Sequence, residues 1–104
     1  MGTDLGLTHL WIKGDSRLPT ASLKDHASAI AFAKARERGD DIVTTAGTGN
    51  SAAALSGICP AIGQRDVILV PRSALKAKIA QLLACGSTVL LLDGTYDQAF
   101  DLCL

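Results

Sequence analysis

Residues 41–50 read Asp-Ile-Val-Thr-Thr-Ala-Gly-Thr-Gly-Asn, and this stretch decides the fold. Asp41–Ala46 is a short run of apolar and β-branched residues that ends at a glycine, which predicts a buried strand. From Gly49 onward the chain is rich in alanine, which predicts a helix. A strand that turns directly into a helix is the unit of a parallel sheet, and such sheets bind ligands at the carboxyl ends of their strands.

The same pattern extends outward from this unit in both directions. Buried strands are predicted at Thr8–Lys13, Asp41–Ala46, Asp66–Val70 and Thr88–Leu92. Helices are predicted at Leu23–Arg38, Gly49–Ile62, Ala74–Cys85 and Tyr96–Leu104. This alternation predicts a single α/β domain over residues 1–104, in which helices flank a four-stranded parallel sheet.

Several residues mark where the predicted helices begin and end. Ser22–Asp25 and Thr95–Gln98 have the spacing of a capping box, in which two side chains satisfy the first amides of a helix. Pro60 is expected to disturb the last turn of its helix. The final helix reaches Leu104 with neither a cap nor a basic residue, so we expect a chain interrupted within an element.

Composition narrows the classes of function. Ten basic residues balance ten acidic ones and no basic run occurs, which argues against nucleic acid and anionic membranes as partners. No apolar stretch approaches the roughly 20 residues that a membrane-spanning helix needs. Cys59, Cys85 and Cys103 lack the spacing of a zinc site or a disulfide framework. We interpret them as buried, reduced thiols of a cytoplasmic protein that has no metal site.

Lys24 is the first candidate for chemistry. It lies in the first turn of its predicted helix, where a cation faces the positive end of the helix dipole. A lysine that must act as a neutral amine in a Schiff base benefits from such a place. From position alone, a solvated lysine near a helix start is the simpler interpretation, and Ser22 and Asp25 are explained as capping partners.

The glycine-containing turn Gly47–Asn50 is the second candidate. Its glycines allow backbone amides to approach an anion, and the helix N-terminus behind them favours negative charge. An ordinary turn with Thr48 or Asn50 as the N-cap is the alternative. Elsewhere, His9 falls in the predicted first strand, and Asp93 is explained by a turn and cap role before a helix.

Taken together, the two segments resemble the fold-type II pyridoxal-phosphate enzymes, and threonine synthases above all. The family pattern Asn-Pro-Thr-Gly-Ser-Phe-Lys-Asp-Arg around the Schiff-base lysine corresponds to Leu18–His26, which read Leu-Pro-Thr-Ala-Ser-Leu-Lys-Asp-His. The family's Leu-Trp-Val/Ile-Lys-Asp-Glu strand corresponds to Leu10–Lys13, and its Ser-Thr-Gly-Asn-Ala-Ala loop corresponds to Gly47–Ala52. Ala77–Leu83 and Asp93–Ala99 are also typical of threonine synthases, so the resemblance covers nearly the whole chain in the correct order.

The resemblance implies the small, lysine-bearing domain of such an enzyme and a role for each matching residue. Lys24 would hold pyridoxal 5'-phosphate as a Schiff base and later move protons of the substrate. Asn50 would hydrogen-bond the phenolic oxygen of the cofactor, and Thr48, Gly49 and Asn50 would receive the substrate carboxylate. The complete enzyme is a lyase of threonine biosynthesis that converts O-phosphohomoserine and water to threonine and phosphate.

The sequence departs from the family pattern at a few positions. His26 stands in place of arginine and Gly47 in place of serine, and both differences bear on substrate handling. Gly14 and Asp15 replace an acidic pair, and Pro60 replaces a residue compatible with a helix. In the family a second lobe supplies the glycine-rich loop for the cofactor phosphate, and no such loop is found in these 104 residues.

Three hypotheses for the function follow. The first is a fragment or truncated homologue of threonine synthase that is inactive alone, with threonine dehydratase as another activity of the same family. The second is a half-enzyme that a separate second lobe completes, and the third is a non-catalytic α/β assembly or binding module. We expect weak, unselective modification of Lys24 by the cofactor. We also expect self-association, since Phe100, Leu102 and Leu104 have no evident burial partners.

Overall fold

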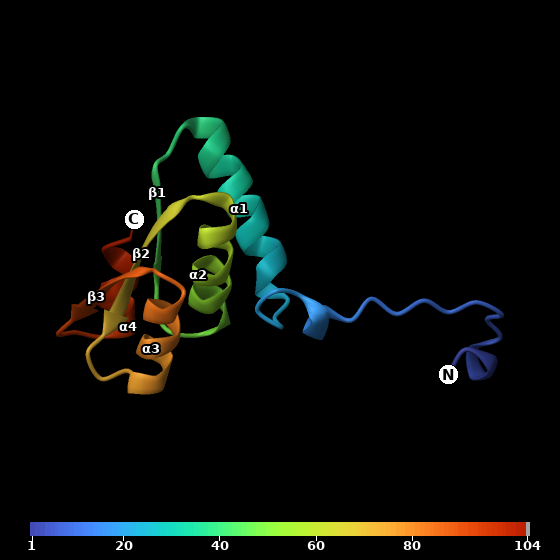
Figure 1. Cartoon of the computed structure of the whole chain (residues 1–104). Helices are drawn as coiled ribbons and strands as arrows, with labels where there is room; N and C mark the ends of the chain where they lie inside the picture. The colour runs from blue at the N-terminus through green and yellow to red at the C-terminus, as the bar shows by residue number, and fades with distance from the viewer. Residues whose placement is uncertain (104) are drawn as a thin grey trace.

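The protein, described here by a computed structural model for residues 1–103, is built on a parallel sheet. Within these residues the sheet has three strands, in the order β1 (Ile42–Ala46), β2 (Arg65–Pro71) and β3 (Thr88–Leu92). The helices that alternate with them are α1 (Lys24–Arg38), α2 (Asn50–Ile62), α3 (Lys76–Ala84) and α4 (Tyr96–Asp101). Two short 3-10 helices, Thr3–Leu5 and Asp15–Arg17, precede α1 (Figure 1).

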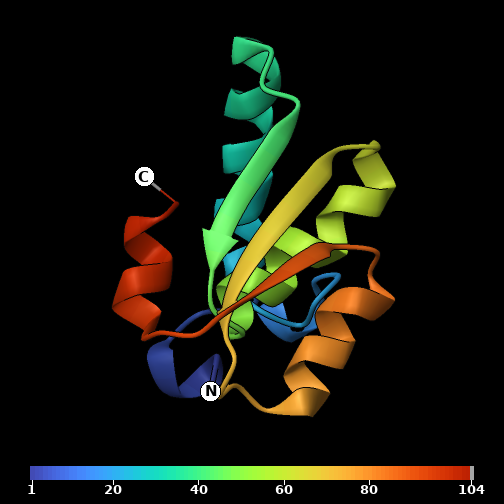
Figure 2. The ribbon, with the colours of Figure 1, turned by 90° about the vertical axis from the view of Figure 1, so that its left-hand side faces the viewer.

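The core lies mainly on one face of the sheet, because β2 is central and alternate residues of a strand face opposite sides. Ile68 and Val70 of β2 are fully buried against Ala52 of α2 and Leu82 of α3. A second cluster joins α1 to α2 through Phe32, Leu55 and Cys59. The short helix α4 packs on β1 and β2 and lies apart from the other three helices (Figure 2).

The predicted strand at Thr8–Lys13 is wrong, so the sheet has three strands rather than four. Residues 7–14 form an arm that leaves the domain without pairing to any described strand (Figure 1). Trp11 is 92% exposed and Ile12 is 75% exposed. An apolar run predicts burial, but a strand also needs a neighbour for its backbone hydrogen bonds, and the run does not identify that neighbour. His9 therefore lies in the arm and not in a strand.

The helix boundaries agree with the sequence in most places. Gly39 closes α1 in a left-handed conformation with φ of 78°. The capping box at Thr95–Gln98 is confirmed, since the Gln98 amide donates to Thr95 Oγ1 and the Thr95 amide donates to Gln98 Oε1. Pro60 lies inside α2, which still continues to Ile62. Unlike the prediction, α3 begins at Lys76 rather than Ala74.

The last helix is shorter than predicted, because α4 ends at Asp101 and Leu102 is its C-cap. Leu104 lies outside the described residues. The three cysteines are free, but only Cys59 is buried, whereas Cys85 and Cys103 are half-buried. None of the helices found in residues 1–103 is long and apolar enough to cross a membrane.

Candidate functional site

A cavity of about 500 Å³ lies at the carboxyl ends of β1 and β2. The start of α1, the loop after β1, the first turn of α2, the residues after β2 and the first residue of α4 surround it. The four residues that the sequence singled out, Lys24, Thr48, Gly49 and Asn50, all line this cavity. The parallel topology thus brings together two segments that are separated by α1 and β1, and the role of each residue stays a prediction.

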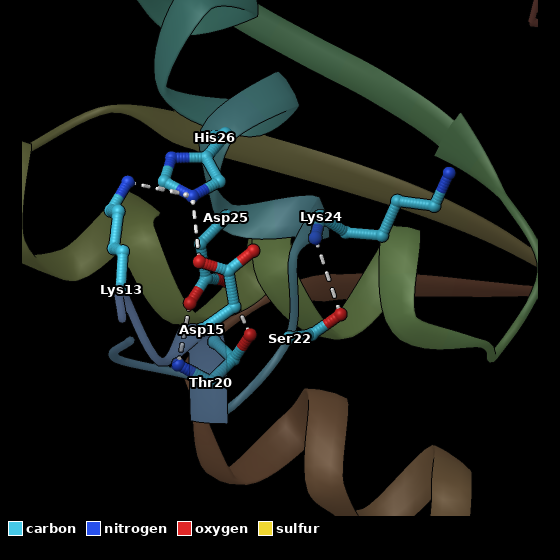
Figure 3. Close-up of polar contacts among 7 residues, drawn as sticks. All are labelled: Lys13, Asp15, Thr20, Ser22, Lys24, Asp25 and His26. Carbon is cyan, nitrogen blue, oxygen red and sulfur yellow. Dashed lines mark hydrogen bonds and ion pairs between the residues drawn. The ribbon is translucent and has the colours of Figure 1, made fainter. Parts of the chain in front are cut away.

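Lys24 is the first residue of α1, and its side chain is not committed to another group. Within residues 1–103, Lys24 Nζ forms no ion pair and no hydrogen bond. Figure 3 shows the side chain extending away from Asp25 and His26. The amine is therefore available to a ligand in the cavity.

The segment before Lys24 is held in a way that the sequence did not predict. The predicted capping box at Ser22–Asp25 is wrong. Ser22 Oγ accepts a hydrogen bond from the Lys24 amide at 3.2 Å, and the Asp25 carboxylate accepts hydrogen bonds from Thr20 instead (Figure 3). Asp25 is 4% exposed and accepts hydrogen bonds from the Thr20 amide, at 2.8 Å, and from the Thr20 hydroxyl. Because α1 begins at Lys24 with Leu23 as its N-cap, Ser22 lies one residue too early to cap the helix.

Ala21 adopts a left-handed conformation in the middle of this segment, with φ of 56°. The family pattern has glycine at this position, and a left-handed conformation costs a residue with a Cβ atom roughly 1 kcal/mol. The Ala21 amide donates to the carbonyl of Leu18 at 2.8 Å, which closes a turn around Pro19. The segment is therefore kept in a strained conformation by its surroundings.

The glycine turn after β1 offers backbone amides to the cavity. Gly47 has φ of 102°, and its amide donates to the Leu69 carbonyl at 2.8 Å. Gly49 is the N-cap of α2 and provides no side-chain cap, so the first amides of this helix have no intrahelical acceptor. Neither Thr48 nor Asn50 acts as the N-cap. An uncapped helix start that lines a cavity suits an anion such as a carboxylate.

Tyr96 is a cavity residue that sequence reasoning missed. A Cβ atom on Gly47 would lie 3.0 Å from Tyr96 Cε2, so the tyrosine ring covers the position where the family pattern has serine. The ring stacks on Phe100, with centroids 6.4 Å apart. Ser73 and Ala74, after β2, are also lining residues that were missed. No local pattern identifies these residues, because they reach the cavity only through the packing of α4 and the end of β2.

Other polar groups lie outside the cavity. His26 Nε2 is 3.3 Å from Lys13 Nζ and 3.4 Å from Asp15 Oδ1, in an exposed cluster beside the arm (Figure 3). Asp93 pairs with Arg72 at 2.5 Å rather than capping α4. Among residues 1–103, no group of three or more His, Cys, Asp or Glu side chains could hold a metal ion.

The sequence of the chain is similar to those of curated threonine synthases. Threonine synthase of Methanocaldococcus jannaschii is 31% identical over 95% of the chain, which spans 25% of that relative. Threonine synthase of Methanosarcina acetivorans is 35% identical over 94% of the chain, which spans 24% of that relative. The chain therefore spans about a quarter of the length of these curated relatives. The resemblance to threonine synthases that the sequence motifs indicated is confirmed.

Solved structures of other proteins share the fold. The processed form of threonine deaminase isoform 2 from Solanum lycopersicum superposes with a TM-score of 0.75 over 96% of the chain and 28% of that structure, at 26% identity. Residues 1–104 match the family described as pyridoxal-phosphate dependent enzymes over their whole length. The chain belongs to the family of pyridoxal-phosphate-dependent enzymes.

Proposed function

We propose that this chain is the lysine-bearing part of a threonine synthase, a lyase that forms threonine and phosphate from O-phosphohomoserine and water. The observation that carries the proposal is the shared cavity. Lys24, whose amine has no partner among residues 1–103, lines this cavity together with Asn50 and the uncapped start of α2. The naming of the relatives as threonine synthases, at 31% and 35% identity, favours this reaction over threonine deamination.

The residues in the cavity fit pyridoxal phosphate. Lys24 supplies a primary amine for attachment of the cofactor aldehyde, and Asn50 supplies an amide that can donate to the phenolic oxygen. When bound, the cofactor withdraws electrons from the carbons of an amino-acid substrate, which makes their protons removable. Lys24 Nζ would accept and return those protons, while the α2 amides beside Thr48 and Gly49 orient the substrate carboxylate.

The proposed activity needs more than these residues. Tight cofactor binding requires a site for its phosphate, and the resemblance assigns that site to a second lobe. We propose that the chain alone has no threonine synthase turnover and gains it only with such a lobe, in the cytoplasm, as the free cysteines favour.

The test combines the purified chain with the remaining three quarters of the Methanocaldococcus jannaschii relative, produced as a separate polypeptide. Phosphate release from O-phosphohomoserine should require both polypeptides and pyridoxal phosphate. It should disappear with Lys24→Ala and persist with Lys34→Ala, which removes an exposed lysine of the same helix. Phosphate release by the chain alone, lost in Lys24→Ala, would contradict the need for a second lobe.

Cofactor attachment can be measured separately. We expect borohydride trapping with excess pyridoxal phosphate to modify Lys24 in the chain alone only weakly, with little preference over Lys34. Peptide mapping after reduction gives the ratio of modified Lys24 to modified Lys34. Stoichiometric labelling of Lys24 alone at low cofactor concentration contradicts this expectation.

We also propose that the exposed apolar surface is an interface for protein. Trp11 and Ile12 on the arm are exposed, and so are Leu90, Phe100 and Leu102 around β3 and α4. Extensive exposed apolar surface is uncommon on a monomer. In the complete enzyme the second lobe would cover it, and in the chain alone a second copy would. Light scattering should detect self-association of the chain, and a monomer at all concentrations would contradict it.

A further inference from the structure

Thr20 touches both helices that carry the proposed site. Its amide and hydroxyl donate to the buried carboxylate of Asp25 on α1. On the other side its methyl group lies against Gly57 of α2, where a Cβ atom would come within 2.6 Å of Thr20 Cγ2. That separation is shorter than any normal contact between carbon atoms, so only glycine allows α2 and this segment to approach so closely.

The two contacts of Thr20 are mechanically linked. The hydroxyl and the methyl group share one Cβ atom, so the methyl cannot rotate away from α2 unless the hydroxyl leaves Asp25. Breaking that bond would leave a buried carboxylate with one fewer donor, which is costly. Thr20 therefore cannot adapt to a larger residue at position 57 without displacing its own backbone.

This contact joins the two halves of the proposed site. Lys24 follows Thr20 by four residues, through the strained Ala21, and Asn50 starts the same helix that carries Gly57. The separation between the Lys24 backbone and the start of α2 thus depends on how closely Thr20 sits on Gly57.

We propose that Thr20 is a positioning residue for Lys24, held by Asp25 and seated on Gly57, which sets the distance between the lysine and the anion-binding start of α2. The importance of that distance for catalysis rests on the proposed function. The contact itself can be tested without cofactor or substrate, so failure of one is distinguishable from failure of the other.

The experiment compares Gly57→Ala, Thr20→Ser and the double variant by hydrogen exchange and amide chemical shifts of the 104-residue chain. Gly57→Ala should displace the Thr20 backbone and weaken the hydrogen bond from its amide to Asp25. Exchange of the residue 20 amide should therefore accelerate by about tenfold or more. Gly57→Ala should also shift the Lys24 amide resonance. Thr20→Ser keeps the hydroxyl and removes the methyl, so the double variant should regain the slow exchange of Thr20→Ser alone.

The double variant is also the matched control for helix propensity. Alanine is a better helix former than glycine, so Gly57→Ala should raise the melting temperature in the Thr20→Ser background and lower it in the parent chain. If the change in melting temperature caused by Gly57→Ala has opposite signs in the two backgrounds, the contact with the Thr20 methyl group is the cause of the destabilisation. If Gly57→Ala fails to fold, Thr20→Val provides the second test, since it keeps the shape, loses the hydroxyl and should also accelerate exchange at residue 20.

Three results would overturn the proposal. The first is unchanged exchange at residue 20 in Gly57→Ala. The second is a double variant no better protected than Gly57→Ala, which would show that the methyl is not the obstacle. The third is a Lys24 amide resonance that stays in place while exchange at residue 20 accelerates, which would show that Thr20 does not position the lysine.

Discussion

Polar groups at the amino end of the sheet are buried and hydrogen-bonded to one another, whereas those at the carboxyl end are open. At the amino end, Asp66, Ser87 and Ser56 are buried, and they form a chain in which Ser87 Oγ lies 2.6 Å from Asp66 Oδ2 and 2.5 Å from Ser56 Oγ. At the carboxyl end, the Lys24 amine is exposed and unpaired within residues 1–103, and α2 begins without a side-chain cap. Buried polar groups must be satisfied by the protein itself, whereas open ones remain available to a ligand. We therefore expect the buried polar groups of the amino end to contribute to stability and the open groups of the carboxyl end to contribute to the proposed binding.

Equivalent serine substitutions at the two ends test this most strongly. Ser87→Ala removes a donor from the buried Asp66 carboxylate and a partner from Ser56, so it should lower the free energy of unfolding by about 2 to 3 kcal/mol. Ser73→Ala, at the exposed carboxyl end, should change it by less than about 0.5 kcal/mol. Chemical denaturation measures both. Equal effects would remove the distinction between the ends.

The buried Cys59 thiol should make the stability of the fold depend on pH. Burial, followed by the charge of Asp66, raises the pKa of Cys59 from 9.0 to about 12. In the unfolded chain the thiol ionises from about pH 9, whereas the folded state keeps its proton, so stability from this group falls as the pH rises from 9 toward 12. At pH 11 the loss should reach about 2 kcal/mol relative to pH 8. The same pH series with Cys59→Ala provides the reference, and parallel curves would show that the thiol is not responsible.

At the carboxyl end, Ala21 should respond to substitution in the opposite direction to an ordinary alanine. Ala21→Gly relieves a left-handed conformation and should raise the free energy of unfolding by about 0.5 to 1 kcal/mol. Ala31→Gly, on the exposed side of α1, should lower it by about 1 kcal/mol. Thermal unfolding distinguishes the two signs. Destabilisation by both substitutions would mean that residue 21 carries no strain.

The smallest expected effect belongs to Lys24 itself. Lys24→Ala removes a cation from the first turn of α1, so it should stabilise the fold by about 0.3 kcal/mol. Lys34→Ala removes a lysine that pairs with Glu37 at 2.6 Å and should cost a similar amount. A clear loss of stability in Lys24→Ala would show that the lysine supports the fold rather than serving a ligand.

Much of the fold could be predicted from local pattern. The strands at Asp41–Ala46, Asp66–Val70 and Thr88–Leu92 are found within one residue of their predicted bounds, because continuous apolar runs between turn residues mark them. Their predicted burial is wrong for the outer strands, since only Ala46 is buried in β1 and no residue is buried in β3.

The shared position of Lys24 and Asn50 was also predicted from the sequence. The sheet explains the place of Asn50, which follows β1, because ligand sites lie at the carboxyl ends of parallel strands. Lys24 follows the arm rather than a strand, so its place at the same edge depends on the packing of α1 against α2.

The arm and the segment before Lys24 could not be predicted in the same way. Thr8–Lys13 has the composition of a strand, yet pairing depends on a neighbour that the local sequence does not specify. Ser22 and Asp25 have the spacing of a capping box, yet the helix begins two residues after Ser22 and Asp25 bonds Thr20 instead.

The sequence by itself determined the order of elements from α1 onward, the parallel sheet and the two segments to which we assign the proposed chemistry, because these depend on patterns within a dozen residues. Only the tertiary structure decided that Tyr96 covers Gly47, that Thr20 seats on Gly57, and that Asp66 and Ser87 satisfy each other in the core. Those contacts join residues distant in the chain, and their distances depend on the packing of whole helices against the sheet.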